Sequence, residues 1–150
     1  MKIRCLSILF VAIALSVFSG CSKDFLKSYN KRIIGEWELY GINKLGFGSS
    51  RIVFDEGYFI FREDGTLIYK PHDATEYEGT WRIRKSQQQT NSENGVSSNT
   101  IHNLIISVVN KNDRTDILTE SFNDMTFTGT NRFNAIVENQ NNQVTYKFKR

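Results

Sequence analysis

The sequence predicts an all-β domain folded as an eight-stranded, up-and-down antiparallel barrel. The first observation is the stretch at 54–83, which contains three successive segments of alternating apolar and polar residues, as half-buried strands require. The second is the pair Asp64-Gly65 between the first two segments, which suits a tight hairpin whose central residues need positive φ. The third is the rest of the chain, where short β-branched or aromatic runs alternate with Gly, Asn and Asp turns and no helical period is sustained.

Length, composition and charge bound the class of protein. At 150 residues, with 39% hydrophobic and 13% aromatic residues, the chain can form one domain with one core. The net charge of +3 includes Lys2 and Arg4, and losing these two with a leader leaves 17 of the 19 basic residues against 16 acidic ones. Such a balance gives no electrostatic surface for nucleic acid. The two cysteines, Cys5 and Cys21, both lie near the N-terminus, which excludes a disulfide framework.

Residues 1–20 are predicted to be a signal peptide. A basic start precedes an apolar run at 6–18, which is too short to span a bilayer. The run ends in Ser19-Gly20-Cys21, and small residues directly before a cysteine resemble the lipobox of bacterial lipoproteins. The resemblance implies cleavage before Cys21 and lipid attachment, including palmitate, at that residue. The alternative is an ordinary signal peptide followed by a chance cysteine.

The resemblance to lipoproteins also implies a cellular address. Acyl chains on Cys21 would anchor the protein to a membrane, since each buried CH₂ contributes about 0.8 kcal/mol. Ser22 after the cysteine is similar to an outer-membrane signal, and Lys23-Asp24 resembles the charged tether of surface-exposed lipoproteins. We therefore expect an outer-membrane lipoprotein that faces the periplasm or the cell surface.

The mature chain is predicted to comprise a lipidated tether at 21–32 and a barrel domain at 33–150. Phe25, Leu26 and Tyr29 in the tether are spaced for one helical turn that docks under the domain. The eight strands are expected at 33–40, at three places within 52–85, and at 101–109, 116–122, 125–131 and 144–149.

Loops and turns complete this prediction. Residues 43–50 are expected to form a glycine-rich loop, and the polar segment 86–100 a mobile loop, because it has too few apolar residues to bury. The strands at 116–122 and 125–131 are expected to pair around Asn123-Asp124. The alternative fold is an immunoglobulin-type β-sandwich, whose first and last strands lie apart, whereas a barrel brings them into contact.

Two Gly-x-Trp motifs, at 35–37 and 79–81, enclose an aromatic strand at 59–61 and the Asp-Gly hairpin. This order resembles the lipocalin-like domains of small lipoproteins from Gram-negative bacteria. The resemblance implies that Trp37 plugs the closed end of the barrel beneath a basic residue, for which Arg150 and Arg132 are the candidates. It also implies that a loop carrying Phe47 lies over the open end as a gate.

The inward aromatic residues decide between two functions. In the first, a non-enzymatic barrel holds a small apolar or amphipathic ligand; in the second, rings fill the barrel, and its outer face or long loop docks another cell-envelope protein. The candidate ligand-binding residues are Trp37, Phe47, Phe59, Phe61, Tyr69, Trp81, Phe127 and Tyr146.

No residue pattern predicts catalysis, a metal or a cofactor. His72 and His102 lack further ligands at metal-binding spacing, and no Ser or Cys is accompanied by a base at a recognisable spacing. Glu76 and Glu78 share one face of a strand, as paired catalytic carboxylates do. That face is opposite the one that carries Trp81, however, and is expected to be exposed to solvent.

Overall fold

The computed structural model describes residues 27–47, 51–92 and 95–150. The predicted leader, Cys21 and the tether residues Phe25 and Leu26 lie outside these ranges. The all-β prediction is confirmed, since strands make up about two thirds of the described residues and the one described helix, α2 (Tyr29–Ile33), is short and precedes them. The strands are β1 (Gly35–Gly46), β2 (Gly57–Phe61), β3 (Thr66–Lys70), β4 (Tyr77–Ser92), β5 (Gly95–Asn110), β6 (Ile117–Phe122), β7 (Asp124–Phe127), β8 (Arg132–Asn139) and β9 (Asn142–Lys149). Within the described part of the chain, no helix has the length and apolarity needed to cross a membrane.

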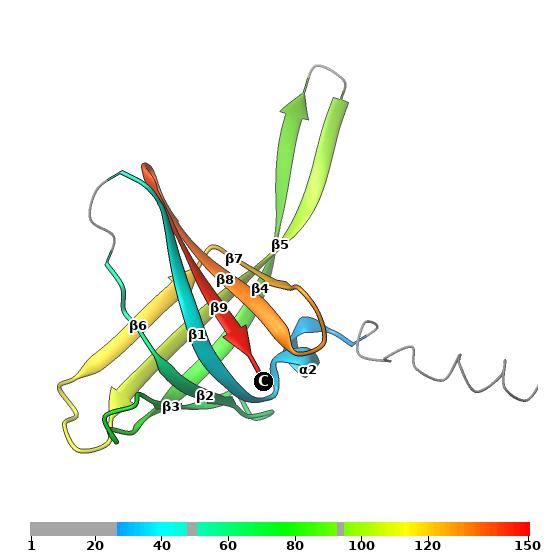
Figure 1. The fold of residues 1–150 in the computed structure, drawn as a ribbon. Coiled ribbons are helices and arrows are strands. Elements are labelled where there is room, and N and C mark those ends of the chain that lie inside the picture. Colours follow the sequence, from blue (N-terminus) through cyan, green and yellow to red (C-terminus); the bar gives the residue numbers. More distant parts are fainter. Residues whose placement is uncertain (1–26, 48–50, 93–94) are drawn as a thin grey trace, which may run out of the picture.

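All nine strands belong to one antiparallel sheet with the order β6-β5-β4-β3-β2-β1-β9-β8-β7. Neighbours in the sheet are consecutive in the chain except for β1 and β9, which pair along most of their lengths. The contact between the first and last strands is the one expected of the up-and-down order and not of the immunoglobulin-type sandwich. The sheet curls around one interior (Figure 1).

The sheet does not close into a continuous hydrogen-bonded barrel, which corrects the prediction on this point. The ladder ends at β6 on one side and at β7 on the other, although only Asn123 separates these strands in the chain. At this corner, the Asn123 amide donates to the Ile136 carbonyl oxygen at 2.7 Å, and the Asn103 side chain donates to the Asn123 carbonyl oxygen at 2.6 Å. The chain therefore crosses directly from one sheet edge to the other, and the predicted pairing of 116–122 with 125–131 is wrong.

The strand count also differs from the eight predicted. The segment expected as one strand at 125–131 ends at Phe127, and the chain then turns into β8, which pairs with both β7 and β9. Phe133 and Ala135 on β8 are fully buried. Their alternation with polar residues is the signal for this ninth strand.

Two segments predicted as loops are strands. β1 continues to Gly46, so the first half of the expected loop at 43–50 pairs with β9, while 48–50 lie outside the described residues. The expected mobile loop at 86–100 forms the distal part of the β4–β5 hairpin, which projects from the body as a two-stranded arm (Figure 1). Its polarity is tolerated because backbone pairing satisfies the peptide groups without burying side chains. Residues 93 and 94 at its tip are outside the described part.

The interior is built from the alternation that the sequence predicted. Inward positions on the strands are fully or almost fully buried, while their neighbours are exposed or half-buried. The buried residues are Ile33, Trp37, Leu39, Phe54, Phe59, Phe61, Leu67, Tyr69, Trp81, Leu104, Ile106, Val108, Phe122, Met125, Phe133, Ala135, Val144, Tyr146 and Phe148.

Gly79 lets β4 approach β5 closely within this sheet. A Cβ atom at Gly79 would lie 2.0 Å from the Ser107 carbonyl oxygen and 2.7 Å from the Val108 Cα atom. Glycine in a strand commonly marks such a site, where another backbone comes near. The first glycine of the second Gly-x-Trp motif is thus required by sheet geometry.

We predict that Gly79→Ala lowers the free energy of unfolding by about 3 kcal/mol, because the added methyl group forces the two backbones apart. Urea unfolding followed by tryptophan fluorescence measures the change. The matched control is Gly129→Ala, where the new methyl group meets no atom within 4 Å, and we expect a change below about 0.5 kcal/mol. Equal stability of the two variants would contradict the close approach.

Candidate functional site

Trp37 occupies one end of the interior, which we call the capped end. Its ring is fully buried, and its indole N–H donates to the Ile33 carbonyl oxygen at 2.7 Å. The Arg150 guanidinium lies over the ring, with Cζ 4.5 Å from the ring centroid. Arg150 also donates to the carbonyl oxygens of Ile34 and Thr130, both at 3.2 Å. Of the two arginines considered from the sequence, Arg150 is therefore the one above Trp37.

Helix α2 covers the capped end where the sheet edges meet. Tyr29 stacks on His102 of β5, with ring centroids 3.6 Å apart, and packs edge-on against Phe127 of β7 at 5.1 Å. Arg32 lies over the Phe127 ring at 4.0 Å and donates to the Gly129 carbonyl oxygen at 2.9 Å. Burial is the main cause that lowers the pKa of His102. The helix thus bridges β5 and β7, which lie on the two sides of the interruption in the ladder.

Most of the predicted ligand-binding rings are packed against one another. Phe148 stacks on Phe133 with centroids 4.4 Å apart and contacts Phe59 edge-on at 5.3 Å. Phe59 also lies 4.6 Å from Tyr69 and 6.4 Å from Phe61. Together with Trp37 and Phe127, these rings fill the interior near the capped end, so they contribute a core and not an accessible surface.

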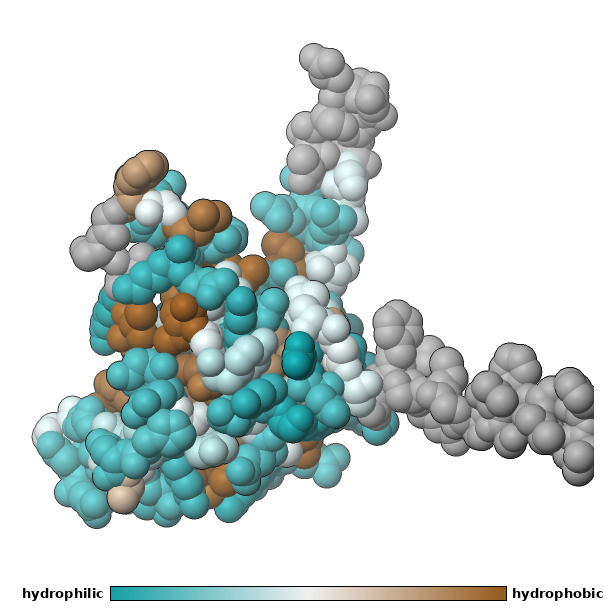
Figure 2. Space-filling model, viewed as in Figure 1, coloured by the Kyte–Doolittle hydropathy of each residue, from teal (hydrophilic) through white to brown (hydrophobic). Residues whose placement is uncertain are grey.

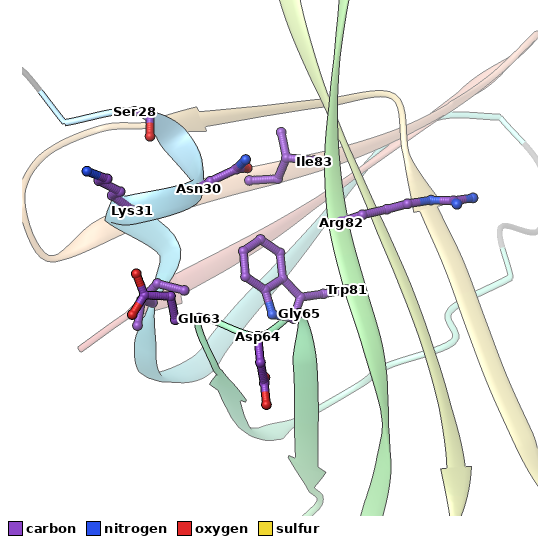
Figure 3. Close-up of a pocket in the computed structure, with 10 residues that line it drawn as sticks. Ser28, Asn30, Lys31, Glu63, Asp64, Gly65, Trp81, Arg82 and Ile83 are labelled. Carbon is purple, nitrogen blue, oxygen red and sulfur yellow. The ribbon is translucent and has the colours of Figure 1, made fainter.

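Trp81 belongs to this cluster but keeps one edge exposed. It packs edge-on against Phe61 at 5.6 Å, and its indole N–H donates to the Arg62 carbonyl oxygen at 3.0 Å. Its exposed edge lies in an open cleft of about 520 Å³ between α2, the β2–β3 hairpin and β4 (Figure 3). Charged side chains of both signs, Lys31 and Glu63 among them, rim the cleft, while the Arg82 side chain points away from it (Figure 3). A shallow surface of this composition suits no particular ligand class.

Tyr146 lies apart from the ring cluster. It is fully buried on β9, and the ring that it contacts is that of Phe122 on β6, at 5.2 Å. Among the described residues, the Tyr146 hydroxyl has no hydrogen-bond partner. Its pKa is raised to about 12, first by burial and then by the charge of Glu120. Tyr146 is thus the one predicted ligand-binding residue that combines burial with an unused polar atom.

Phe47, the predicted gate, is 92% exposed just after the end of β1. Its amide donates to the Asn141 carbonyl oxygen at 3.2 Å, which ties it to the β8–β9 turn. Leu45 beside it is 72% exposed. Instead, Phe54 from the following segment enters the interior and contacts Phe59 and Tyr69 edge-on.

The paired carboxylates considered from the sequence form an ion-pair network on the outer face. Glu76 lies 3.3 Å from Lys70 and also pairs with Lys111, and Glu78 lies 3.6 Å from Lys111 and 3.8 Å from Arg114. The hydrogen bond from Lys111 is the main cause that lowers the pKa of Glu76, which keeps this carboxylate ionised. Within the described ranges, no three His, Cys, Asp or Glu side chains gather as a metal site would require.

The structure therefore separates the predicted residues into three groups. Six of them pack at the capped end, Phe47 is on the surface, and Tyr146 stands alone near Glu120 and Phe122. Sequence reasoning missed Glu120 as an inward-facing group. The signal was the alternation of Leu118, Glu120 and Phe122 on one face of a strand. Comparison of the chain with family models, with curated proteins and with solved structures finds no match.

We predict that Arg150→Met lowers the free energy of unfolding by about 1–2 kcal/mol, because the guanidinium loses its contact with Trp37 and two hydrogen bonds. Urea unfolding provides the measurement. Arg132→Met is the matched control: Arg132 is exposed at the start of β8, and we expect a change below about 0.5 kcal/mol. A larger loss of stability at Arg132 than at Arg150 would contradict the conclusion that Arg150 stabilises the capped end.

Proposed function

We propose that the protein is a membrane-anchored lipoprotein whose curled sheet acts as a lipocalin-like barrel and binds a small apolar or amphipathic molecule without catalysing a reaction. The observation that carries the proposal is the capped end, where Arg150 lies 4.5 Å above the buried Trp37 ring. The lipocalin resemblance implies this arrangement at the closed end of a barrel. Closing one end with packed rings leaves the other end for ligand entry.

The distribution of side chains supports ligand entry away from the cap. The large rings cluster near Trp37, whereas aliphatic side chains line the interior beside Tyr146, among them Ile42 and Val144. Apolar residues lie open on the face of the molecule below the β1–β9 tip, at the left of the body in Figure 2. Small-molecule sites are typically concave and apolar with few polar groups.

The lipid anchor rests on the Ser19-Gly20-Cys21 segment, which lies outside the described residues. Helix α2 begins at Tyr29, so the eight residues from Cys21 to the helix extend over at most about 28 Å. Anchoring at Cys21 would therefore hold the capped end near the membrane, and the interior beside Tyr146 would face away from it. We propose the outer membrane as the site of anchoring, on the periplasmic side or at the cell surface.

Native mass spectrometry of residues 22–150, purified from a Gram-negative host, tests this proposal. We expect a reproducible extra mass that is released on denaturation, because an apolar site that is open to one side retains a ligand from the host. The mass identifies the ligand class. A protein that stays free of extra mass, both as purified and after incubation with a lipid extract of the host envelope, would contradict the proposal.

A second candidate function is the docking of another cell-envelope protein, and the β4–β5 arm favours it. Beyond Trp81 on β4 and before Leu104 on β5, the described strand pairings join these two strands only to each other. Apart from the His102 amide, which donates to Asp124, both edges of the arm lack a further strand among the described residues and can accept one from a partner.

We predict that replacing residues 87–99 by a short turn changes the free energy of unfolding by less than about 1 kcal/mol, because the described side chains of this segment are exposed. If the arm docks a partner, a protein captured from envelope extracts by the intact chain is lost with the deletion. Urea unfolding and pull-down measure the two effects. Capture that survives the deletion would exclude the arm as the docking element.

A further inference from the structure

The β4–β5 arm leaves a long backbone edge unused on its β4 side (Figure 1). At the base of the arm, the Trp81 amide points away from β5 and donates to the Gly65 carbonyl oxygen at 2.9 Å. Because backbone groups alternate sides along an antiparallel strand, every second residue after Trp81 also directs its N–H and C=O away from β5. Beyond Ile83, which lines the cleft beside α2, these residues are Lys85, Gln87, Gln89 and Asn91. Among the described residues, no strand other than β5 pairs with this part of β4.

The β5 edge of the arm is shorter. His102 lies opposite Lys85, and its amide donates to Asp124 Oδ1 at 3.1 Å, on the side away from β4. The same alternation then places the free backbone groups of β5 at Val96, Ser98 and Thr100. β4 therefore offers the longer uninterrupted edge for an added strand.

The β4 edge lacks the features that usually prevent strands from pairing. Natural sheet edges are protected by charged residues, by proline or by bulges. The sequence from Ser86 to Ser92 contains no charged residue and no proline, and its register with β5 continues without a shift. Glu93, which lies outside the described residues, is the only charged residue in the sequence from 86 to 101. A two-stranded hairpin is marginally stable by itself in water, so an added strand would stabilise the arm.

We propose that the arms of two copies of this chain pair antiparallel through their β4 edges and form one four-stranded sheet. The free positions on β4 are symmetric about Gln88, so a two-fold axis at Gln88 brings Lys85 opposite Asn91 and Gln87 opposite Gln89. Each of these residues has one free N–H and one free C=O, so the pairing forms about eight hydrogen bonds between the copies.

A second copy suits this edge because the edge is complementary to itself. It supplies a strand of the same length that is equally free of charge from Ser86 to Ser92. The basic residues Arg84 and Lys85 lie at the base of each arm, and antiparallel pairing places the two Lys85 residues about 20 Å apart. Like charges therefore do not face each other across the pair. The inference does not rest on the small-molecule function, and it names a second copy where the second candidate function has a different protein.

Cysteine cross-linking of the full chain tests this geometry. The two Gln88 residues would face each other at a non-hydrogen-bonded site, where Cα atoms are about 4.5 Å apart and a disulfide can form. We expect Gln88→Cys to give a covalent dimer on mild oxidation, as seen by non-reducing gel electrophoresis. The matched control is Asn99→Cys, opposite Gln88 within the same arm, which should stay monomeric. The chain without an added cysteine corrects for Cys5 and Cys21.

Proline substitution tests the backbone edge itself. Gln87→Pro removes an N–H that faces the second copy and not β5, so the hairpin can persist while the pairing between copies is weakened. Sedimentation equilibrium of the full chain in density-matched detergent should show a dissociation constant for the dimer that is at least about tenfold higher. Ser98→Pro makes the same change on the free side of β5 and should alter that constant by less than about twofold.

The outcomes separate this inference from both proposed functions. The mass of a single chain at every concentration, cross-linking through Asn99→Cys in place of Gln88→Cys, or equal effects of the two prolines would overturn it. A monomeric chain whose arm captures a different protein from envelope extracts would also overturn it and would leave the second candidate function standing. Ligand retention is independent of these results, because the described side chains at 86–89 are exposed and lie outside the interior.

Discussion

The constraint on which the fold depends is the corner at Asn123. One residue separates β6 from β7, and yet these strands end opposite sides of the hydrogen-bonded sheet. The Asn123 backbone and side chain bond to β8 through the Ile136 carbonyl oxygen and the Glu138 amide, both at 2.7 Å. On the other side, Asp124 Oδ1 accepts from the His102 amide of β5 at 3.1 Å. Since β5 and β8 are thereby held together, the sheet must curl, and an enclosed interior follows.

The curled sheet divides its interior into two chemically different regions. Near Trp37, rings from six strands and helix α2 contact one another, and such pairs stabilise a core beyond the area they bury. Near Tyr146, aliphatic and small side chains replace the rings, and a hydroxyl and a carboxylate are included. Stability is concentrated in the first region. The Tyr146 hydroxyl and the half-buried Glu120 side chain lie in the second region.

The alternation of apolar and polar residues predicted the strands that have one buried face. Phe59 and Phe61, and likewise Val144 and Tyr146, are buried on the faces that the sequence assigned to the interior. The prediction failed where backbone pairing decides the structure without apolar side chains, as in the arm at 86–100. It also failed at Asn123-Asp124, because the same two residues are typical of a hairpin turn and of a corner.

The candidate site was less accessible to sequence reasoning than the fold. Aromatic residue type alone could not distinguish rings that pack together, such as Phe59 and Phe148, from a ring with an unused polar atom, such as that of Tyr146. That distinction depends on which residues oppose Tyr146 across the interior. The role of Arg150 was easier to foresee, because the lipocalin resemblance places a cation above Trp37.

The pairing of β1 with β9 has a consequence for how the chain folds. Glu38 pairs with Lys149 and Gly46 with Asn142, so these contacts join residues about a hundred positions apart. Contacts of such long range are slow to form, because the loop between them must lose its entropy before the contact stabilises anything. The hairpins β2–β3 and β4–β5 are local and can form first. The joining of β1 with β9 is therefore the late event, and until it occurs both strands expose edges through which neighbouring chains can associate.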